Sequence, residues 1–167
     1  MFSARDPSDL DRFFRGLTEH AFHGRLGIVD PPLVDYVAEL LVRFIRHDQL
    51  RVLPGSEPVA CDAVSHMLAI VQHEPPEVAR DEYRHIGDYT LFWSGVYPEA
   101  LRRFQHPSQP DHLLDYREAG KQAYRLAAAL EPEDAVETRH VLALLSEEYD
   151  SCIVGLGEVR RAWGEAA

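Results

Sequence analysis

Apolar side chains recur every three or four residues along most of this chain, the spacing that places them on one face of an α-helix. The first stripe follows Pro7-Ser8, ends at Gly24 and comprises Leu10, Phe13, Phe14, Leu17 and Ala21. The second follows Asp30-Pro31-Pro32, where an acidic cap precedes proline in the first helical turn. No segment alternates apolar and polar residues over the length of a strand. The pattern predicts an all-α fold, a single-domain helical bundle over residues 1–167 with about six to eight helices.

Capping residues, proline and glycine predict where the later helices begin and end. Ser56-Glu57-Pro58 predicts the start of a third helix, and Asp111 predicts the cap of a helix that runs to about Leu130. A last helix is expected from about Glu133, with apolar positions at heptad-like spacing: Val141, Leu145, Tyr149, Cys152 and Leu156. Gly155 and Gly157 are expected to interrupt this helix before Val159.

The helix expected at about 77–95 carries the most informative segment of the chain. Its second half, from Tyr89 to Tyr97, is apolar on all sides, which is typical of a helix that is buried on all sides. Gly87 and Gly95 each cost about 0.5–1 kcal/mol in a helix relative to alanine. We therefore expect both to allow close approach of the helix that carries Gly120, Ala123 and Ala127.

Asp88 stands at the start of this apolar stretch, where an isolated carboxylate is costly. We expect it to be buried and paired with an arginine or histidine. A second hypothesis is a small ligand pocket on the central helix, lined by His85, Asp88, Tyr89, Trp93 and Tyr97. The ligand of such a pocket stays unknown at this stage.

Two Glu-x-x-His pairs suggest a metal site as an alternative. Glu82 with His85, and Glu137 with His140, have the spacing that ferritin-like di-iron bundles use. Glu39 and Glu118 could supply the two further carboxylates of such a site. The register of the last two expected helices argues against it, because Glu118 would lie opposite about residue 144 and not opposite Glu137, an offset of roughly 10 Å along the helix axis. The alternative function is a metal-dependent, possibly di-iron-like, enzyme; no catalytic residue or cofactor is assigned otherwise.

Composition narrows the class of partner. The chain has 28 acidic and 17 basic residues and a formal net charge of -11, so we expect no binding to nucleic acid and none to anionic membranes. No signal peptide or membrane span is visible, and Cys61 and Cys152 form no C-x-x-C motif. One lysine against sixteen arginines is typical of a GC-rich bacterial genome. These features predict a bacterial, cytoplasmic protein.

One further pattern spans two segments. The string Gly87-Asp88-x-x-Leu91-Phe92-x-Ser94-Gly95, followed by Asp115-Tyr116-x-x-x-Gly120-x-x-Ala123-Tyr124, resembles a family of uncharacterised bacterial helical proteins with a G-D-x-x-L-F-x-x-G core and a later D-Y-x-x-x-G-x-x-A-Y run. The resemblance implies that the two segments belong together and implies no activity. We expect a non-enzymatic binding or accessory protein that acts through its surface or a small pocket, with a protein partner or a homodimer as further options.

Overall fold

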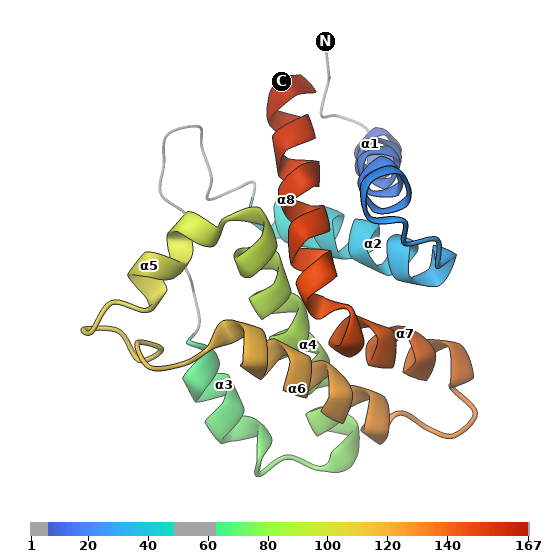
Figure 1. Ribbon diagram of the computed structural model, residues 1–167. Helices are drawn as coiled ribbons and strands as arrows, with labels where there is room; N and C mark the ends of the chain where they lie inside the picture. Colours follow the sequence, from blue (N-terminus) through green and yellow to red (C-terminus); the bar gives the residue numbers. More distant parts are fainter. Residues whose placement is uncertain (1–6, 49–62, 167) are drawn as a thin grey trace.

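The computed structural model describes residues 7–48 and 63–166, and within these ranges the chain forms eight α-helices and no strand. The expectation of an all-α bundle is confirmed. The helices are arranged around α4 (Figure 1). Their bounds are α1 Pro7–Glu19, α2 Pro31–Asp48, α3 Val64–Val71, α4 Pro76–Val96, α5 Leu101–Phe104, α6 Tyr116–Leu130, α7 Val136–Glu147 and α8 Tyr149–Ala166. A π-helical turn, His20–Arg25, extends α1, and a 3₁₀ turn, Pro98–Ala100, precedes α5.

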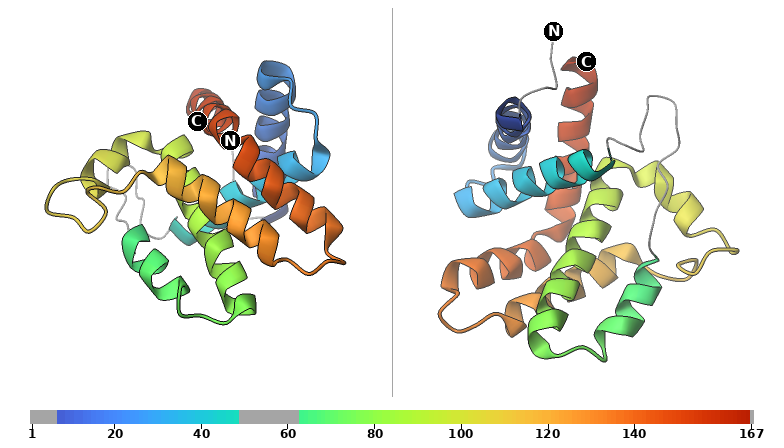
Figure 2. Two further views of the ribbon diagram at one scale, coloured as in Figure 1. Left: turned by 60° about the horizontal axis from the view of Figure 1, so that its bottom comes forward. Right: turned by 180° about the vertical axis from the view of Figure 1, so that it is seen from behind.

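Helix α4 is the centre of the bundle, as its apolar second half predicts. Every residue from Ile86 to Val96 is buried. Helices α3, α6 and α8 all pack on α4. Seen from behind, α4 lies in front of α6, and α2 crosses in front of α8 (Figure 2). The first two helices, α1 and α2, pack on each other and then on α8 and α7 respectively.

Glycines permit the closest helix contacts. A Cβ atom on Gly87 would lie 2.6 Å from the ring of Tyr124 in α6, and one on Gly120 would meet the hydroxyls of Tyr149 and Thr90. The expectation that Gly87 and the Gly120 helix approach each other is therefore confirmed. The same expectation for Gly95 is wrong, because its missing Cβ makes room for Leu156 of α8, 2.6 Å away.

Three helix boundaries differ from those expected. The cap of α6 is Asp115, which accepts hydrogen bonds from the amides of Arg117 and Glu118. Asp111 instead accepts bonds from the amides of Val64 at 2.9 Å and Ser65 at 2.8 Å, so it caps α3 from 47 residues away. The expected start of the third helix at Ser56 lies outside the described residues.

The other two differences concern the first and the last helices that were expected. The last expected helix divides at Glu148 into α7 and α8, and Gly155 and Gly157 continue α8 without interruption. Gly155 is needed for packing, since a Cβ there would lie 2.5 Å from the ring of Phe22. The first helical segment continues past Gly24 to Arg25, and Gly27, with φ of 68°, follows in the left-handed conformation that glycine favours.

Candidate functional site

Asp88 holds three helices together through direct hydrogen bonds. Its Oδ1 accepts from the hydroxyl of Tyr36 in α2 at 2.7 Å and from that of Tyr124 in α6 at 2.7 Å. Its Oδ2 accepts from Nη2 of Arg43 in α2 at 2.6 Å. The side chain of Asp88 is 4% exposed. The expectation that Asp88 is buried and paired with an arginine is confirmed.

Burial and hydrogen bonding shift the pKa values of Asp88 and of the two tyrosines that donate to it. Burial raises the pKa of Asp88, while Arg43 and the two tyrosine hydroxyls favour its ionised form and offset part of that shift. Burial, followed by the negative charge of Asp88, raises the pKa of Tyr124 and of Tyr36. Both tyrosines are therefore protonated donors at neutral pH. Nε of Arg84 donates to the Tyr36 hydroxyl at 3.0 Å, which completes the cluster.

The side chain of Asp88 is buried, both of its oxygens accept hydrogen bonds from protein donors, and it is not among the described lining residues of the pocket beside it. Its effect reaches the surface through Arg43, whose side chain is 53% exposed while its Nη2 is bonded to Asp88. A guanidinium held at one end by a buried carboxylate keeps its remaining donors in a defined direction. Asp88 is thus a positioning residue for an exposed cation.

A pocket opens where α2 and α4 meet, beside this arginine. Its volume is about 510 Å³, within the range of small-molecule sites, and its described lining residues are Arg43, Phe44, Arg46 and His85. The ring of Phe44 stacks on that of Phe92 at 4.8 Å and lies nearly parallel to that of His85 at 6.5 Å. The guanidinium of Arg43 lies 5.8 Å from the centre of the Phe44 ring. The pocket therefore combines cationic groups with two planar rings.

Of the five residues proposed from the sequence, the four with rings form one row along α4, and Asp88 instead contacts Tyr36, Arg43 and Tyr124. The rings of His85, Tyr89, Trp93 and Tyr97 follow one another at 6.2, 6.2 and 5.7 Å. Tyr89 and Trp93 are buried, Tyr97 is half-buried beneath the guanidinium of Arg160, and His85 is exposed. Of the five, His85 is the one among the described lining residues of the pocket.

Sequence reasoning missed Arg43, Phe44 and Arg46, which the structure places around His85. One sequence signal could have indicated this cationic site. Arg43-Phe44-x-Arg46 lies in the last turns of α2, where the helix dipole stabilises positively charged side chains. The partners Tyr36 and Tyr124 left no such signal, because an amphipathic helix accepts tyrosine at many positions.

The described residues do not form the cluster of metal ligands that the di-iron alternative requires. Within residues 7–48 and 63–166, no group of three or more His, Cys, Asp or Glu side chains is arranged to hold a metal ion. Glu82 and His85 on α4, and Glu137 and His140 on α7, therefore do not form a shared site. Nε2 of His140 lies instead 3.2 Å from Oδ2 of Asp30, at the start of α2.

Comparison with known proteins gives no further guide to the pocket. No family model, no curated protein and no solved structure matches the chain. Among the helices of the described residues, none is both long and apolar enough to cross a bilayer.

Proposed function

We propose that this protein is a binding protein, without catalytic activity of its own, that takes a small anionic ligand with a planar ring in the pocket between α2 and α4. The observation that carries the proposal is the exposed Arg43, fixed by buried Asp88, beside the stacked rings of Phe44 and His85. The cellular setting that we propose is the bacterial cytoplasm, without nucleic acid or membrane as a partner.

The charges around the pocket support an anionic ligand. Arg43 and Arg46 line it, and an arginine guanidinium presents a planar set of donors that matches a carboxylate or phosphate. Arg46 also lies 3.4 Å from Asp11, in a pair whose side chains are 44% and 52% exposed. Exposed pairs of this kind contribute little free energy.

The rings support a planar ligand. The ring of the half-buried Phe44 stacks on the buried ring of Phe92, and this contact fixes the orientation of Phe44. A flat ligand that lies against the exposed ring surface of Phe44 and His85 would bury apolar area, and its own ring could make the offset or edge-to-face contacts that aromatic pairs prefer.

Calorimetric titration with 2-naphthoate, and with the neutral 2-naphthamide as its matched analogue, tests the proposal. We expect the anion to bind at least about fivefold more tightly than the amide, since two unit charges about 4 Å apart interact by roughly 1 kcal/mol even in water. Arg46→Gln should reduce this difference, the remainder being due to Arg43, and His85→Ala should weaken the binding of both compounds.

Arg102→Gln is the matched control, because Arg102 is an exposed arginine of α5 that does not line the pocket. It makes the same change of charge as Arg46→Gln and should leave the titration unchanged. Equal affinity for the two naphthyl compounds, or equal effects of the two arginine substitutions, would contradict the proposal.

A further inference from the structure

A second pocket lies on another face of the bundle, between α3 and α6. Its volume is about 390 Å³. It shares no lining residue with the pocket around His85. Its apolar lining comes from all three neighbouring segments: Leu68 of α3, Leu114 before α6, and Ala119, Ala123 and Leu126 of α6. Tyr83 of α4 and the side-chain amides of Gln72 and Gln122 complete it together with two acidic residues.

The pocket follows from the packing of the helices. Helices α3 and α6 both pack on α4, but they have little contact with each other. Along the side of α6 that faces this gap, Ala119 is half-buried and Ala123 is fully buried, and both have only a methyl side chain. A pocket therefore stays open between the two helices, and Leu68, Leu114 and Ala119 are partly exposed around it.

The charges at this pocket have one sign. Asp115 and Glu118 line it, whereas no lysine or arginine does among the described lining residues. Asp115 also caps α6, so the amides of that helix end offset part of its charge. The side chain of Glu118 is 71% exposed and lies 3.8 Å from Lys121, whose ammonium is held more closely by Asp150 at 2.8 Å. Glu118 is consequently the carboxylate most open to a new cation.

We propose that the pocket between α3 and α6 binds a small organic cation, namely a protonated amine with an apolar body. The apolar body would cover the partly exposed Leu68, Leu114 and Ala119, and removing this apolar surface from water is favourable. The ammonium would lie at the acidic edge, where Glu118 and Asp115 attract it. This inference does not depend on the proposed function, since it concerns other residues and the opposite ligand charge.

Three probes with the same apolar body separate charge from hydrophobicity: 4-phenylbutylamine, 4-phenylbutan-1-ol and 4-phenylbutyrate. In calorimetric titrations of the full chain at pH 7, we expect the amine to bind at least about fivefold more tightly than the alcohol. The carboxylate should bind more weakly than the alcohol. Glu118→Gln should reduce the affinity for the amine to that for the alcohol and leave the alcohol unchanged.

Two substitutions test the location. Ala119→Phe fills the pocket from within, and Gln122→Trp covers it from an exposed position that does not disturb the core. Both should abolish binding of the amine and the alcohol. Circular dichroism melts show whether each variant is folded; should Ala119→Phe unfold, Gln122→Trp decides the location alone.

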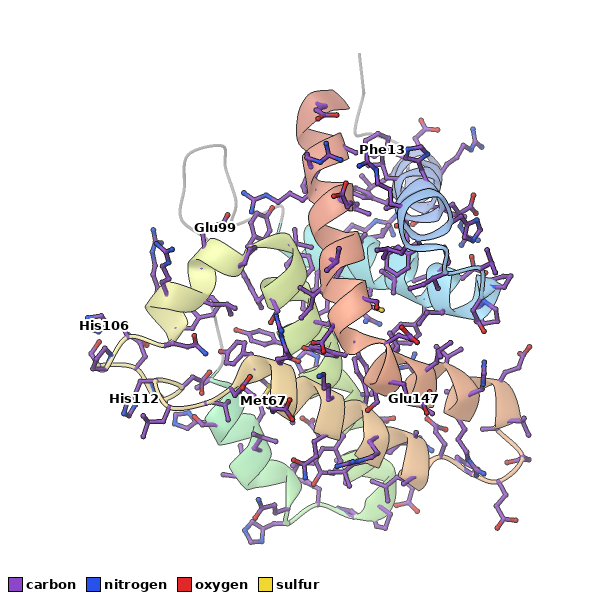
Figure 3. The ribbon with its side chains drawn as sticks, in the orientation of Figure 1. Phe13, Met67, Glu99, His106, His112 and Glu147 are labelled. Atoms are coloured by element: carbon purple, nitrogen blue, oxygen red, sulfur yellow. The ribbon has the colours of Figure 1, made fainter. Side chains whose placement is uncertain are left out.

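Glu147→Gln is the control for charge, because Glu147 is exposed on α7 and does not line the pocket. In Figure 3 it is labelled to the right of α6, whereas α3 lies to the left. It should leave all three titrations unchanged. The proposal is overturned if the amine does not bind saturably, if the three probes bind equally, or if Gln122→Trp does not weaken the amine.

Discussion

Gly87→Ala adds one methyl group at the closest contact between α4 and α6. In the present structure the new Cβ would lie 2.6, 2.7 and 2.9 Å from three ring carbons of Tyr124. Ordinary carbon contacts are about 3.5–4.0 Å, so the ring must shift by roughly 1 Å. Such a shift also pulls the Tyr124 hydroxyl away from Asp88, to which it donates at 2.7 Å.

Overpacking of this kind costs typically about 1–3 kcal/mol. The helix gains back about 0.5–1 kcal/mol, because alanine has a higher helix propensity than glycine. The net loss of unfolding free energy is therefore between about 0 and 2.5 kcal/mol, with a middle value of about 1 kcal/mol. For a chain of this size, each kcal/mol corresponds to about 2–4 °C in melting temperature. We expect Gly87→Ala to melt several degrees below the natural protein.

Gly16→Ala provides the matched control within the same protein. Gly16 is an exposed position of α1, and a Cβ there would have no atom within 4 Å. This variant has the gain in helix propensity without the clash, so its melting temperature should rise by about 1–4 °C. Thermal melts followed by circular dichroism measure both variants. If Gly87→Ala melts at or above the temperature of Gly16→Ala, the close contact with Tyr124 does not limit this interface and the reasoning is refuted.

Three other changes test the buried polar groups. Asp88→Ala should lower the unfolding free energy by about 1–3 kcal/mol, mainly because the fully buried hydroxyl of Tyr124 is left without its acceptor; a denaturant melt with no change would contradict the structural role of Asp88. Burial raises the pKa of Cys152 to about 12, so in a Cys61→Ser background the folded protein should react with a thiol reagent at pH 8 far more slowly than the unfolded protein; equal rates would show that this thiol is accessible. Burial tends to raise the pKa of Asp111, but hydrogen bonds from Tyr116 and from the start of α3 outweigh it and lower the pKa below its usual value. Its stabilising effect is therefore present above about pH 4 and lost as the pH falls through the lowered pKa, so Asp111→Ala should destabilise more at pH 7 than at pH 2; a constant difference between these pH values would exclude this linkage.

The elements that could be predicted from the sequence are those fixed by local patterns. Helix α4 is the clearest case, because a stretch that is apolar on every side can be stable only where other helices surround it. The pairing of Asp88 was predictable for the same reason, since a carboxylate in such a stretch needs donors. Which donors it finds was not predictable: Tyr36, Arg43 and Tyr124 are 52, 45 and 36 residues away.

The capping aspartates show where local reasoning fails. Asp111 and Asp115 both precede the helix that ends at Leu130, and the sequence pattern predicted Asp111 as its cap. The structure assigns Asp115 to that helix, because Asp111 satisfies the amides at the start of α3 instead. A bond between residues 47 positions apart has no counterpart in helical periodicity. The predicted pocket around His85 was incomplete for the same reason: its other described lining residues lie on α2, far from His85 in the sequence, and periodicity within one helix does not reveal contacts between helices.

The packing of α1 on α8 has a consequence for how this protein is made. Phe14 of α1 contacts Trp163 of α8 edge to face at 5.2 Å, and Phe22 fits against Gly155. During translation, the apolar surface of α1 that packs on α8 leaves the ribosome about 140 residues before α8 does. At about 5–20 residues per second, this surface stays exposed for roughly 7–30 seconds in each nascent chain. The first helices are thus the part of the chain that a cellular chaperone would meet before the native contacts exist.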